Sequence, residues 1–401
     1  MEAPSPPGRN PASLRHFLML LMAMSAIGPL ALNIIVPALP RLAVTMQSDP
    51  GTVQLTISLF VFGLAVSQLA LGPLSDRFGR RPVALAGLGL TALASLGAVA
   101  AASIDQLILA RTVQALGAST GLVIGRAMIR DLYDRDRSAS LIGAVASVMV
   151  LAPMVAPLIG GILDTAFGWE SIFLFVALAG LAVFGWAAAA LPETRPDHIT
   201  GGGGRYVLRE MRALLRDRNF VGYALQSALG TATFFAFIGA APHLVIGRMG
   251  ISSAEFGLWF MISAFGYMAG NFLAARLSTR LGIHTMIRAG MAIQFAGALL
   301  LVSVALLFPD GGPLTVFPMQ FLVSLGNGIF LPNATAGAVS VRPQASGTAS
   351  GITGFLQMGT GALAVQAMSH VMAVYPSALA LAVAMLALVI AAALAFAMVR
   401  R

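Results

Sequence analysis

The chain has 401 residues, of which 58% are hydrophobic and only 10% are charged, and its mean hydropathy is +0.87. Soluble globular domains carry roughly 25% charged residues, so this composition excludes a soluble domain and indicates a protein embedded in lipid. The chain contains no cysteine, which excludes a disulfide framework and thiolate chemistry.

About twelve apolar segments can be counted between polar breaks, and each is long enough for an α-helix to cross ~30 Å of hydrocarbon. Backbone polar groups in lipid must pair within their own segment, and the segments lack the alternation of a β-barrel. We therefore predict an all-α membrane protein of about 12 transmembrane helices. The predicted spans are 15–39, 53–74, 82–102, 106–128, 138–162, 170–191, 219–243, 255–276, 285–308, 314–335, 347–372 and 375–399.

The spans divide the chain into four parts. Residues 1–14 form a polar, proline-rich tail with no clear cleavage site, so we expect an uncleaved first helix. Two six-helix bundles follow, over 15–191 and 218–399, and the stretch 192–217 links them.

The linker combines a flexible and a periodic segment. Four glycines, Gly201 to Gly204, interrupt it, and the stretch Tyr206 to Arg216 then places apolar residues at helical spacing with arginines between them. This pattern suits a helix lying on the inner membrane surface, and a partly ordered loop is the alternative.

Arginine distribution predicts the orientation, because all 24 basic residues are arginines. If both termini are cytoplasmic, 21 arginines lie on the inner side, and only Arg41, Arg111 and Arg248 do not. We therefore expect a multi-pass protein of the bacterial inner membrane with both termini in the cytoplasm. The net charge of +9 is spread over helix ends that face anionic lipid, so it does not indicate nucleic-acid binding.

The most informative stretch is a charged turn between the second and third spans, which contains Gly72, Ser75, Asp76, Arg77, Gly79, Arg80 and Arg81. A second turn at half-length spacing repeats Ser75, Arg77 and Gly79 as Ser278, Arg280 and Gly282, with Thr279 in place of Asp76. This repeat predicts a transporter with two related halves.

The first turn has the chemistry of a latch that holds one state of a rocking pair of bundles. Asp76 can accept hydrogen bonds from Arg77, Arg80 or Arg130, or from a helix N-terminus, which we expect near Ser346 to Thr348. The alternative is that the turn only anchors topology.

Arg111 lies a few residues inside the fourth span, where a buried guanidinium must be paired or hydrated. Gln114 stands three residues later on the same helix face. Arg111 is therefore a candidate functional residue, and the alternative is that its side chain reaches out to the outer interface.

Prolines shape the first and fifth spans. Pro37 leaves the carbonyl of Asn33 without its helical donor, which exposes a polar backbone site and predicts a cavity. The fifth span loses ladder hydrogen bonds and gains a small, smooth face, so it can pack tightly and hinge, or serve packing alone. Its hinge and packing residues are Pro153, Pro157, Gly160 and Gly161.

Four motifs in this order carry a family resemblance: the turn Gly72 to Arg81, the run Arg111 to Gln114 followed by Gly117, the segment Ala152 to Gly161, and Leu191 to Thr194. Together they resemble the drug:proton antiporter branch of the Major Facilitator Superfamily. Ala-Pro-x-x-Ala-Pro-x-x-Gly-Gly in the fifth span and Gly347 to Gly351 at the start of the eleventh most resemble the Bcr/CflA-type drug-resistance exporters.

The resemblance implies two bundles that alternate access and export small molecules in exchange for protons, with no cofactor and as a monomer. It implies that the first turn controls the inner gate, that Arg111 and Gln114 handle protons beside the cavity, and that the fifth span favours export. Relatives usually carry Asp where this chain has Asn33, and Gly where it has Ala115.

The departure at Asn33 matters because an amide, unlike the carboxyl group of Asp, does not titrate. None of the acids falls at the midpoint of a predicted span. The remaining proton candidates are Asp76, Asp164, His243 and His370, and each is also explained by a structural or solvent-exposed role.

The substrate cavity is expected between the halves near the membrane midplane, lined by the first, fourth, seventh and tenth helices as in the family. Its candidate residues are Asn33, Ile34, Gln114, Thr120, Gln226, Thr231, Phe234, Gln320, Ser324 and Asn327. Amides, hydroxyls and aromatic rings suit neutral amphipathic drugs, and the missing midplane carboxylate argues against strongly cationic ones. Some of these residues also serve helix packing.

Other functions fit less well. The sequence has no catalytic cluster, metal site or nucleotide-binding loop, so we do not expect an enzyme, and any active transport must use an ion gradient. A receptor or scaffold is a further alternative. Within transport, the alternative is a facilitator or uptake carrier for a small metabolite without a midplane proton site.

Overall fold

The computed structural model describes residues 11–133, 135–195, 204–342 and 345–399. Residues 1–10 of the predicted tail and 196–203 of the predicted linker lie outside them. The described residues form helices and connecting loops without strands, which confirms the all-α prediction.

The first half contains α1 (Pro11–Asn33), η1 (Val36–Ala38), α2 (Leu39–Thr45), α3 (Pro50–Phe78), α4 (Arg80–Val99), α5 (Ile104–Ala118), α6 (Thr120–Leu132), α7 (Arg135–Phe167) and α8 (Glu170–Ala190). The second contains α9 (Gly204–Arg216), α10 (Arg218–Ala241), η2 (Pro242–Arg248), α11 (Ser253–Leu281), α12 (Ile283–Leu307), η3 (Pro313–Thr315), α13 (Phe317–Ser340), α14 (Ser346–Val374) and α15 (Ala378–Ala397).

Among the described residues, ten helical spans are long and apolar enough to cross a membrane, and the apolar part of α7, Leu151–Phe167, is a shorter eleventh. With the 29-residue helix α14 they are consistent with the predicted count of twelve. Several helices extend beyond their predicted spans into the charged turns, because arginine and serine are compatible with helix outside lipid.

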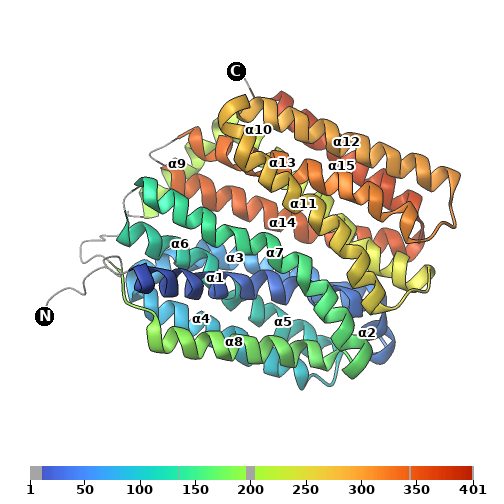
Figure 1. Ribbon diagram of the computed structural model, residues 1–401, viewed down its shortest axis with the longest axis horizontal. Helices are drawn as coiled ribbons and strands as arrows, with labels where there is room; N and C mark the ends of the chain where they lie inside the picture. The colour runs from blue at the N-terminus through green and yellow to red at the C-terminus, as the bar shows by residue number, and fades with distance from the viewer. Residues whose placement is uncertain (1–10, 134, 196–203, 343–344, 400–401) are drawn as a thin grey trace, which may run out of the picture.

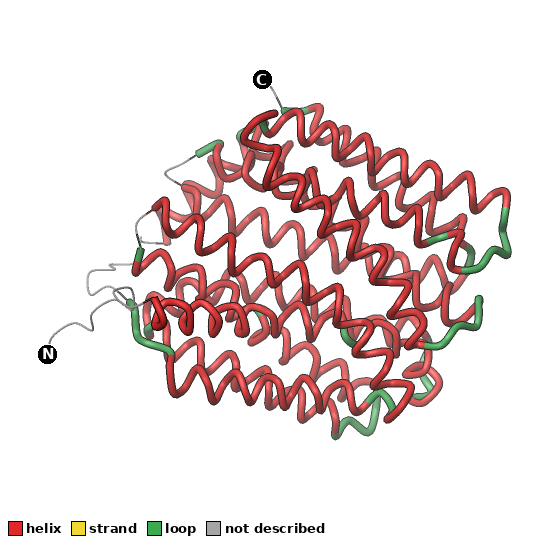
Figure 2. The backbone as a smooth tube through the Cα atoms, in the orientation of Figure 1, coloured by secondary structure: helices red, strands yellow, loops and turns green. Residues whose placement is uncertain are grey.

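The helices form two bundles that lie side by side (Figure 1). The first half occupies one side of the molecule and α10 to α15 the other, and loops cap both ends (Figure 2). The start of α1, the end of α15 and α9 lie at one end of the bundles, and α2 lies at the other. We refer to these as the α9 end and the α2 end.

The bundles meet where α7 packs on α11 and where α3 packs on α14. Glycines permit the first contact: a Cβ at Gly161 would collide with the backbone of Ser253, and one at Gly257 would lie 2.8 Å from the carbonyl oxygen of Pro157. On the second seam, Ser58 of α3 donates to Gln366 of α14 at 3.0 Å. These contacts lie toward the α2 end.

Three long spans are interrupted. The first helix ends at Asn33, and the chain continues through a 3-10 turn that contains Pro37, whereas the sequence predicted a carbonyl without its helical donor within one continuous span, 15–39. The fourth span is broken at Ser119, and α10 passes into the π-helical turn η2. Neither of these two breaks was predicted. By contrast, α7 runs through Pro153 and Pro157 without interruption.

The predicted linker helix is present as α9. Leu214 is buried against the second bundle, and Glu210 pairs with Arg342 at 3.1 Å. This ion pair fixes the described part of the linker to the connection between α13 and α14.

Candidate functional site

The charged turn is built around Gly79, which joins α3 directly to α4. Gly79 has φ +101°, a conformation that residues with a Cβ rarely adopt, and its N–H donates to the carbonyl of Ser75 at 3.1 Å. Gly282 repeats this geometry between α11 and α12, with φ +78° and an N–H donated to Ser278 at 3.0 Å. The sequence repeat is therefore also a repeat of backbone geometry.

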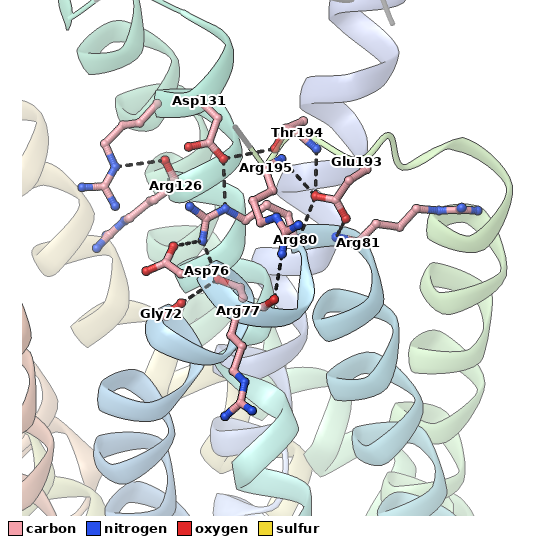
Figure 3. Close-up of polar contacts among 12 residues, drawn as sticks. Gly72, Asp76, Arg77, Arg80, Arg81, Arg126, Asp131, Glu193, Thr194 and Arg195 are labelled. Atoms are coloured by element: carbon pink, nitrogen blue, oxygen red, sulfur yellow. Dashed lines mark hydrogen bonds and ion pairs between the residues drawn. The ribbon is translucent and has the colours of Figure 1, made fainter. Parts of the chain in front are cut away.

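Arg80 lies at the centre of a cluster of polar side chains at the α9 end (Figure 3). It is only 4% exposed. Its Nη1 lies 2.6 Å from Oδ1 of Asp76 and donates to Oγ of Ser75 at 2.6 Å. Its Nε donates to Oδ2 of Asp131 at 2.9 Å. Two carboxylates thus compensate one buried guanidinium.

Glu193, which follows α8, caps the N-terminus of α4. Its carboxylate accepts the backbone N–H groups of Arg80 at 2.8 Å and Arg81 at 3.1 Å. It also accepts the N–H groups of Thr194 and Arg195, both at 3.0 Å. Burial alone would raise the pKa of Glu193, but the four N–H donors hold it below the ordinary value.

Two further contacts bind the segment after α8 to the turn. Thr194 donates its hydroxyl to Oδ2 of Asp131 at 3.2 Å, and Arg195 donates to the carbonyl of Arg77 at 2.7 Å. Figure 3 shows how Glu193, Thr194 and Arg195 enclose the turn from one side. We call Ser75, Asp76, Arg80, Asp131 and Glu193 the Arg80 cluster.

Sequence reasoning identified the turn but missed Asp131 and Glu193 as its partners. The sequence could have indicated Glu193 in one way. It is an acid that follows one predicted helix, and it lies at the same end of the bundle as the N-terminus of another helix that has no capping side chain of its own. Asp76 pairs with Arg80, one of its predicted donors, and the contacts described for it stay within the first bundle rather than reaching α14.

The other predicted members of the gating motif lie outside the cluster. Gly72 contributes its carbonyl, which accepts from Ser75 at 2.9 Å. Arg77 stacks on Phe78 at 5.1 Å, and Arg81 donates to the carbonyl of Ala188 at 2.8 Å. Arg280 is exposed.

The second turn carries Ile283 directly after its glycine, where the first carries Arg80. With Thr279 in place of Asp76, the second turn lacks both members of the ion pair. The charged pairing at the α9 end is therefore asymmetric between the halves.

Arg111 is buried, 1% exposed, so the alternative that it reaches the interface is wrong. It donates to the carbonyls of Ala31 at 2.8 Å and Thr56 at 3.2 Å, and to the side chain of Gln114 at 2.5 Å. Its guanidinium lies 4.0 Å from the ring centre of Phe60. Backbone carbonyls, an amide and a ring thus replace a carboxylate.

Gln114 extends this arrangement by donating to Oγ of Ser95 at 2.6 Å. The sequence predicted the contact between Arg111 and Gln114 from their spacing. It did not indicate the two carbonyls, because these come from α1 and α3.

The remaining proton candidates differ in their surroundings. Asp164 is buried at the α2 end between the bundles. His243 lies partly buried in η2, and its Nε2 has no hydrogen-bond partner among the described residues. His370 is exposed on α14.

The glycines of the fifth span face different neighbours. A Cβ at Gly160 would collide with the carbonyl of Ile34, whereas Gly161 faces α11 of the other bundle. Ile34 therefore packs against α7, and this segment of α7 contacts both the broken first helix and the second bundle.

Four predicted cavity residues share one property: each is a buried amide whose carbonyl oxygen has no hydrogen-bond partner among the described residues. They are Asn33, Gln226, Gln320 and Asn327. Their N–H groups do find partners, for example the carbonyl of Pro29 for Asn33 at 2.8 Å and that of Gly230 for Asn327 at 3.1 Å. A buried acceptor left unpaired costs about 1–3 kcal/mol, so these oxygens favour a donor.

The other cavity candidates are placed less favourably. Thr120 packs against Gly87 of α4 within the first bundle, which does not support a cavity position. Thr231 donates to its own helix, and Ser324 accepts from Gln320 at 3.3 Å. Phe234 lies partly buried in an aromatic group with Phe260.

We expect the Arg80 cluster to stabilise the first bundle strongly. Arg80→Met leaves Asp76 and Asp131 without their counter-charge, so the free energy of unfolding should fall by about 2–5 kcal/mol. Arg81→Met is the matched control, since Arg81 is exposed, and it should change that free energy by less than about 1 kcal/mol. Denaturant unfolding of the purified protein measures both, and equal effects would contradict the central position of Arg80.

The lowered pKa of Glu193 predicts a pH dependence of stability. The carboxylate stabilises the fold fully above its unfolded pKa, near the ordinary 4.5, and this contribution is lost as pH falls through the lower folded pKa. Wild type should therefore exceed Glu193→Gln in stability near neutral pH, and the difference should shrink in acid. Thermal unfolding of both proteins across pH measures it, and a difference independent of pH would count against the cap.

Comparison with known proteins agrees with this geometry. The family model of the Major Facilitator Superfamily matches residues 21–365. The Chloramphenicol resistance protein of Pseudomonas aeruginosa is 31% identical over 85% of this chain and 80% of its own length. Multidrug resistance protein D of Escherichia coli K12 is 30% identical over 87% of each chain.

A third relative, the Bicyclomycin resistance protein homolog of Haemophilus influenzae, is 29% identical over 86% of this chain and 87% of its own length. Among solved structures, a bacterial homologue of the human lysosomal transporter Spinster superposes with a TM-score of 0.74 at 15% identity, covering 98% of this chain and 97% of that one. These relatives confirm the resemblance to drug-resistance transporters and exclude an enzyme. The chain is a multi-pass membrane protein that belongs to the Major Facilitator Superfamily.

Proposed function

We propose that this protein exports small neutral amphipathic compounds, similar to chloramphenicol or bicyclomycin, by alternating access in exchange for protons. The names of its relatives support a drug-efflux role. The observation that carries the choice of substrate is that four of the predicted cavity residues are buried amides with unpaired carbonyl oxygens. Such acceptors suit ligands that bring hydroxyl or amide N–H donors.

The charge in the first bundle supports the same substrate class. Arg111 is a buried cation, and none of the hydrogen-bond partners that the described residues give it is a carboxylate. A desolvated cationic drug would find this positive charge without a compensating acid, whereas a neutral drug would not be repelled.

In this proposal the α9 end faces the cytoplasm of a bacterial cell, as the arginine distribution favours, and the protein acts as a monomer in the inner membrane. The Arg80 cluster holds the first bundle rigid at that end. Asp76 is 39% exposed at its side chain and pairs with Arg80 alone among the described contacts. It is therefore the acid best placed to exchange partners with the N-terminus of α14 when the α9 end closes.

One observation favours a second candidate, a facilitator or uptake carrier for a small metabolite. Asn33 stands where the resembling exporters usually have an acid, and its amide cannot carry a proton. A facilitator of this kind would need no proton site, because the gradient of its own substrate drives the transport.

Drug accumulation in an efflux-deficient host tests the proposed substrate class. Cells that express the wild type should accumulate several-fold less chloramphenicol than cells that express Arg111→Met, whose guanidinium contacts with α1 and α3 are lost. Accumulation of a quaternary ammonium dye should be the same in both. A reduced dye level that is lost in Arg111→Met would contradict the preference for neutral compounds, and unchanged chloramphenicol levels would contradict export.

A further inference from the structure

Asp164 is the buried acid that none of the motifs above explains. It is 1% exposed, near the end of α7 that reaches the α2 end. Its Oδ2 lies 2.8 Å from Oγ of Ser253, the first residue of α11 in the other bundle. A carboxyl group therefore bridges the two bundles where they meet.

The contacts of Ser253 indicate how this bridge works. Its Oγ lies 3.0 Å from the carbonyl oxygen of Pro37 and 2.8 Å from Asp164. A serine hydroxyl has one proton, so it cannot donate fully to two acceptors at once. Both contacts become full hydrogen bonds when Asp164 is protonated, because its O–H donates to Ser253 and Ser253 donates to Pro37.

The charged groups around Asp164 do not compensate the negative charge that it would carry without that proton. Arg41 of α2 donates its Nη1 to the main-chain carbonyl of Asp164 at 2.6 Å, but it lies 3.8 Å from Oδ1 and its side chain is 54% exposed. Oδ1 has no hydrogen-bond partner among the described residues. Glu170 of α8 adds a like charge, and Glu255 of α11 faces Trp259 instead. An ionised Asp164 would thus be a poorly compensated buried charge.

The close packing of α7 on α11 next to this bridge means that the bridge must break when the bundles separate. Gly161, one helical turn before Asp164, touches the backbone of Ser253, and Gly257 touches that of Pro157. Opening of the α2 end must separate α7 from α11 and break the contact between Asp164 and Ser253. Water then reaches the carboxyl group and favours its ionised form.

We propose that Asp164 is a proton-binding site whose occupancy closes the α2 end. Protonation joins Asp164, Ser253 and Pro37 into one chain of hydrogen bonds across the bundles, and loss of the proton to water releases them. This inference rests on the alternating-access part of the proposed function. With the α2 end outward, an acidic exterior would return the emptied carrier to its inward-open state.

The distance between the bundles at the α2 end tests this site directly. The chain has no cysteine, so spin labels can be placed at Val44→Cys and Leu314→Cys without a background. Both positions are exposed, one in α2 and the other in η3. Pulsed electron spin resonance on the full chain in lipid nanodiscs, without drug, then gives the closed fraction between pH 5 and pH 9.

The wild-type closed fraction should rise several-fold as pH falls. Asp164→Asn, whose amide is neutral at every pH and can donate to Ser253, should stay closed throughout. Asp310→Asn is the matched control, since Asp310 lies in the loop between α12 and η3 with its side chain 83% exposed, and it should keep the wild-type pH dependence. A wild type insensitive to pH, or a pH response that survives in Asp164→Asn, would overturn the proposal.

Ser253→Ala provides a second test that does not depend on the folding of the Asp164 variant. Loss of the bridging hydroxyl removes both hydrogen bonds, so it should lower the closed-to-open ratio in acid by at least about two- to tenfold, the equivalent of a single hydrogen bond. An unchanged ratio would contradict the bridge.

Failure of this site and failure of the proposed export are separable. A label distance that responds to chloramphenicol but not to pH would overturn the role of Asp164 alone. A normal pH response in a protein that does not lower drug accumulation would overturn the export proposal and leave the proton site standing.

Discussion

Compensation of buried arginine charge is the constraint on which this structure depends most. The protein meets it in two ways. At the α9 end, Arg80 is paired with the carboxylates of Asp76 and Asp131. Deeper in the first bundle, Arg111 is held by carbonyls of α1 and α3, by Gln114 and by a ring of α3. Each arginine therefore fixes the relative positions of several helices of the first bundle.

The two ends of the molecule differ in the contacts that hold the helices together there. The contacts described for the Arg80 cluster belong to the first bundle, so they stiffen the α9 end without closing it. At the α2 end, Ser253 links α11 to both α7 and the chain around Pro37, and glycines bring the backbones into contact. Opening of this end costs hydrogen bonds and close packing, whereas the α9 end has a half-exposed Asp76 available to form new contacts. This asymmetry is what an alternating-access carrier requires.

Much of the fold could be predicted from the sequence, because segment length and the repeated Gly79 and Gly282 turns are local properties. Pro37 likewise marked the carbonyl of Asn33 as lacking its helical donor, although it did not predict that the helix ends there. Partners that lie far apart along the chain could not be predicted, and the cap that Glu193 forms on α4 and the carbonyls that hold Arg111 belong to this class. The position of Thr120 could not be predicted for a related reason: helical periodicity shows which residues share a face, but only the packed structure shows that Thr120 meets Gly87 of α4. The bridge between Asp164 and Ser253 depends on how the bundles dock, which no local pattern contains.

We propose that the protein exchanges drug for protons without a midplane acid, and drug-driven proton flux is the measurement that distinguishes this from transport without protons. Inside-out vesicles that contain the wild type, a pH-sensitive dye and a maintained proton gradient should show proton release when chloramphenicol is added, and a vesicle without the protein should not. A silent wild type, with release restored by Asn33→Asp, would contradict the account. It would mean that the amide at Asn33 has removed the coupling site, and that the protein carries its substrate without protons.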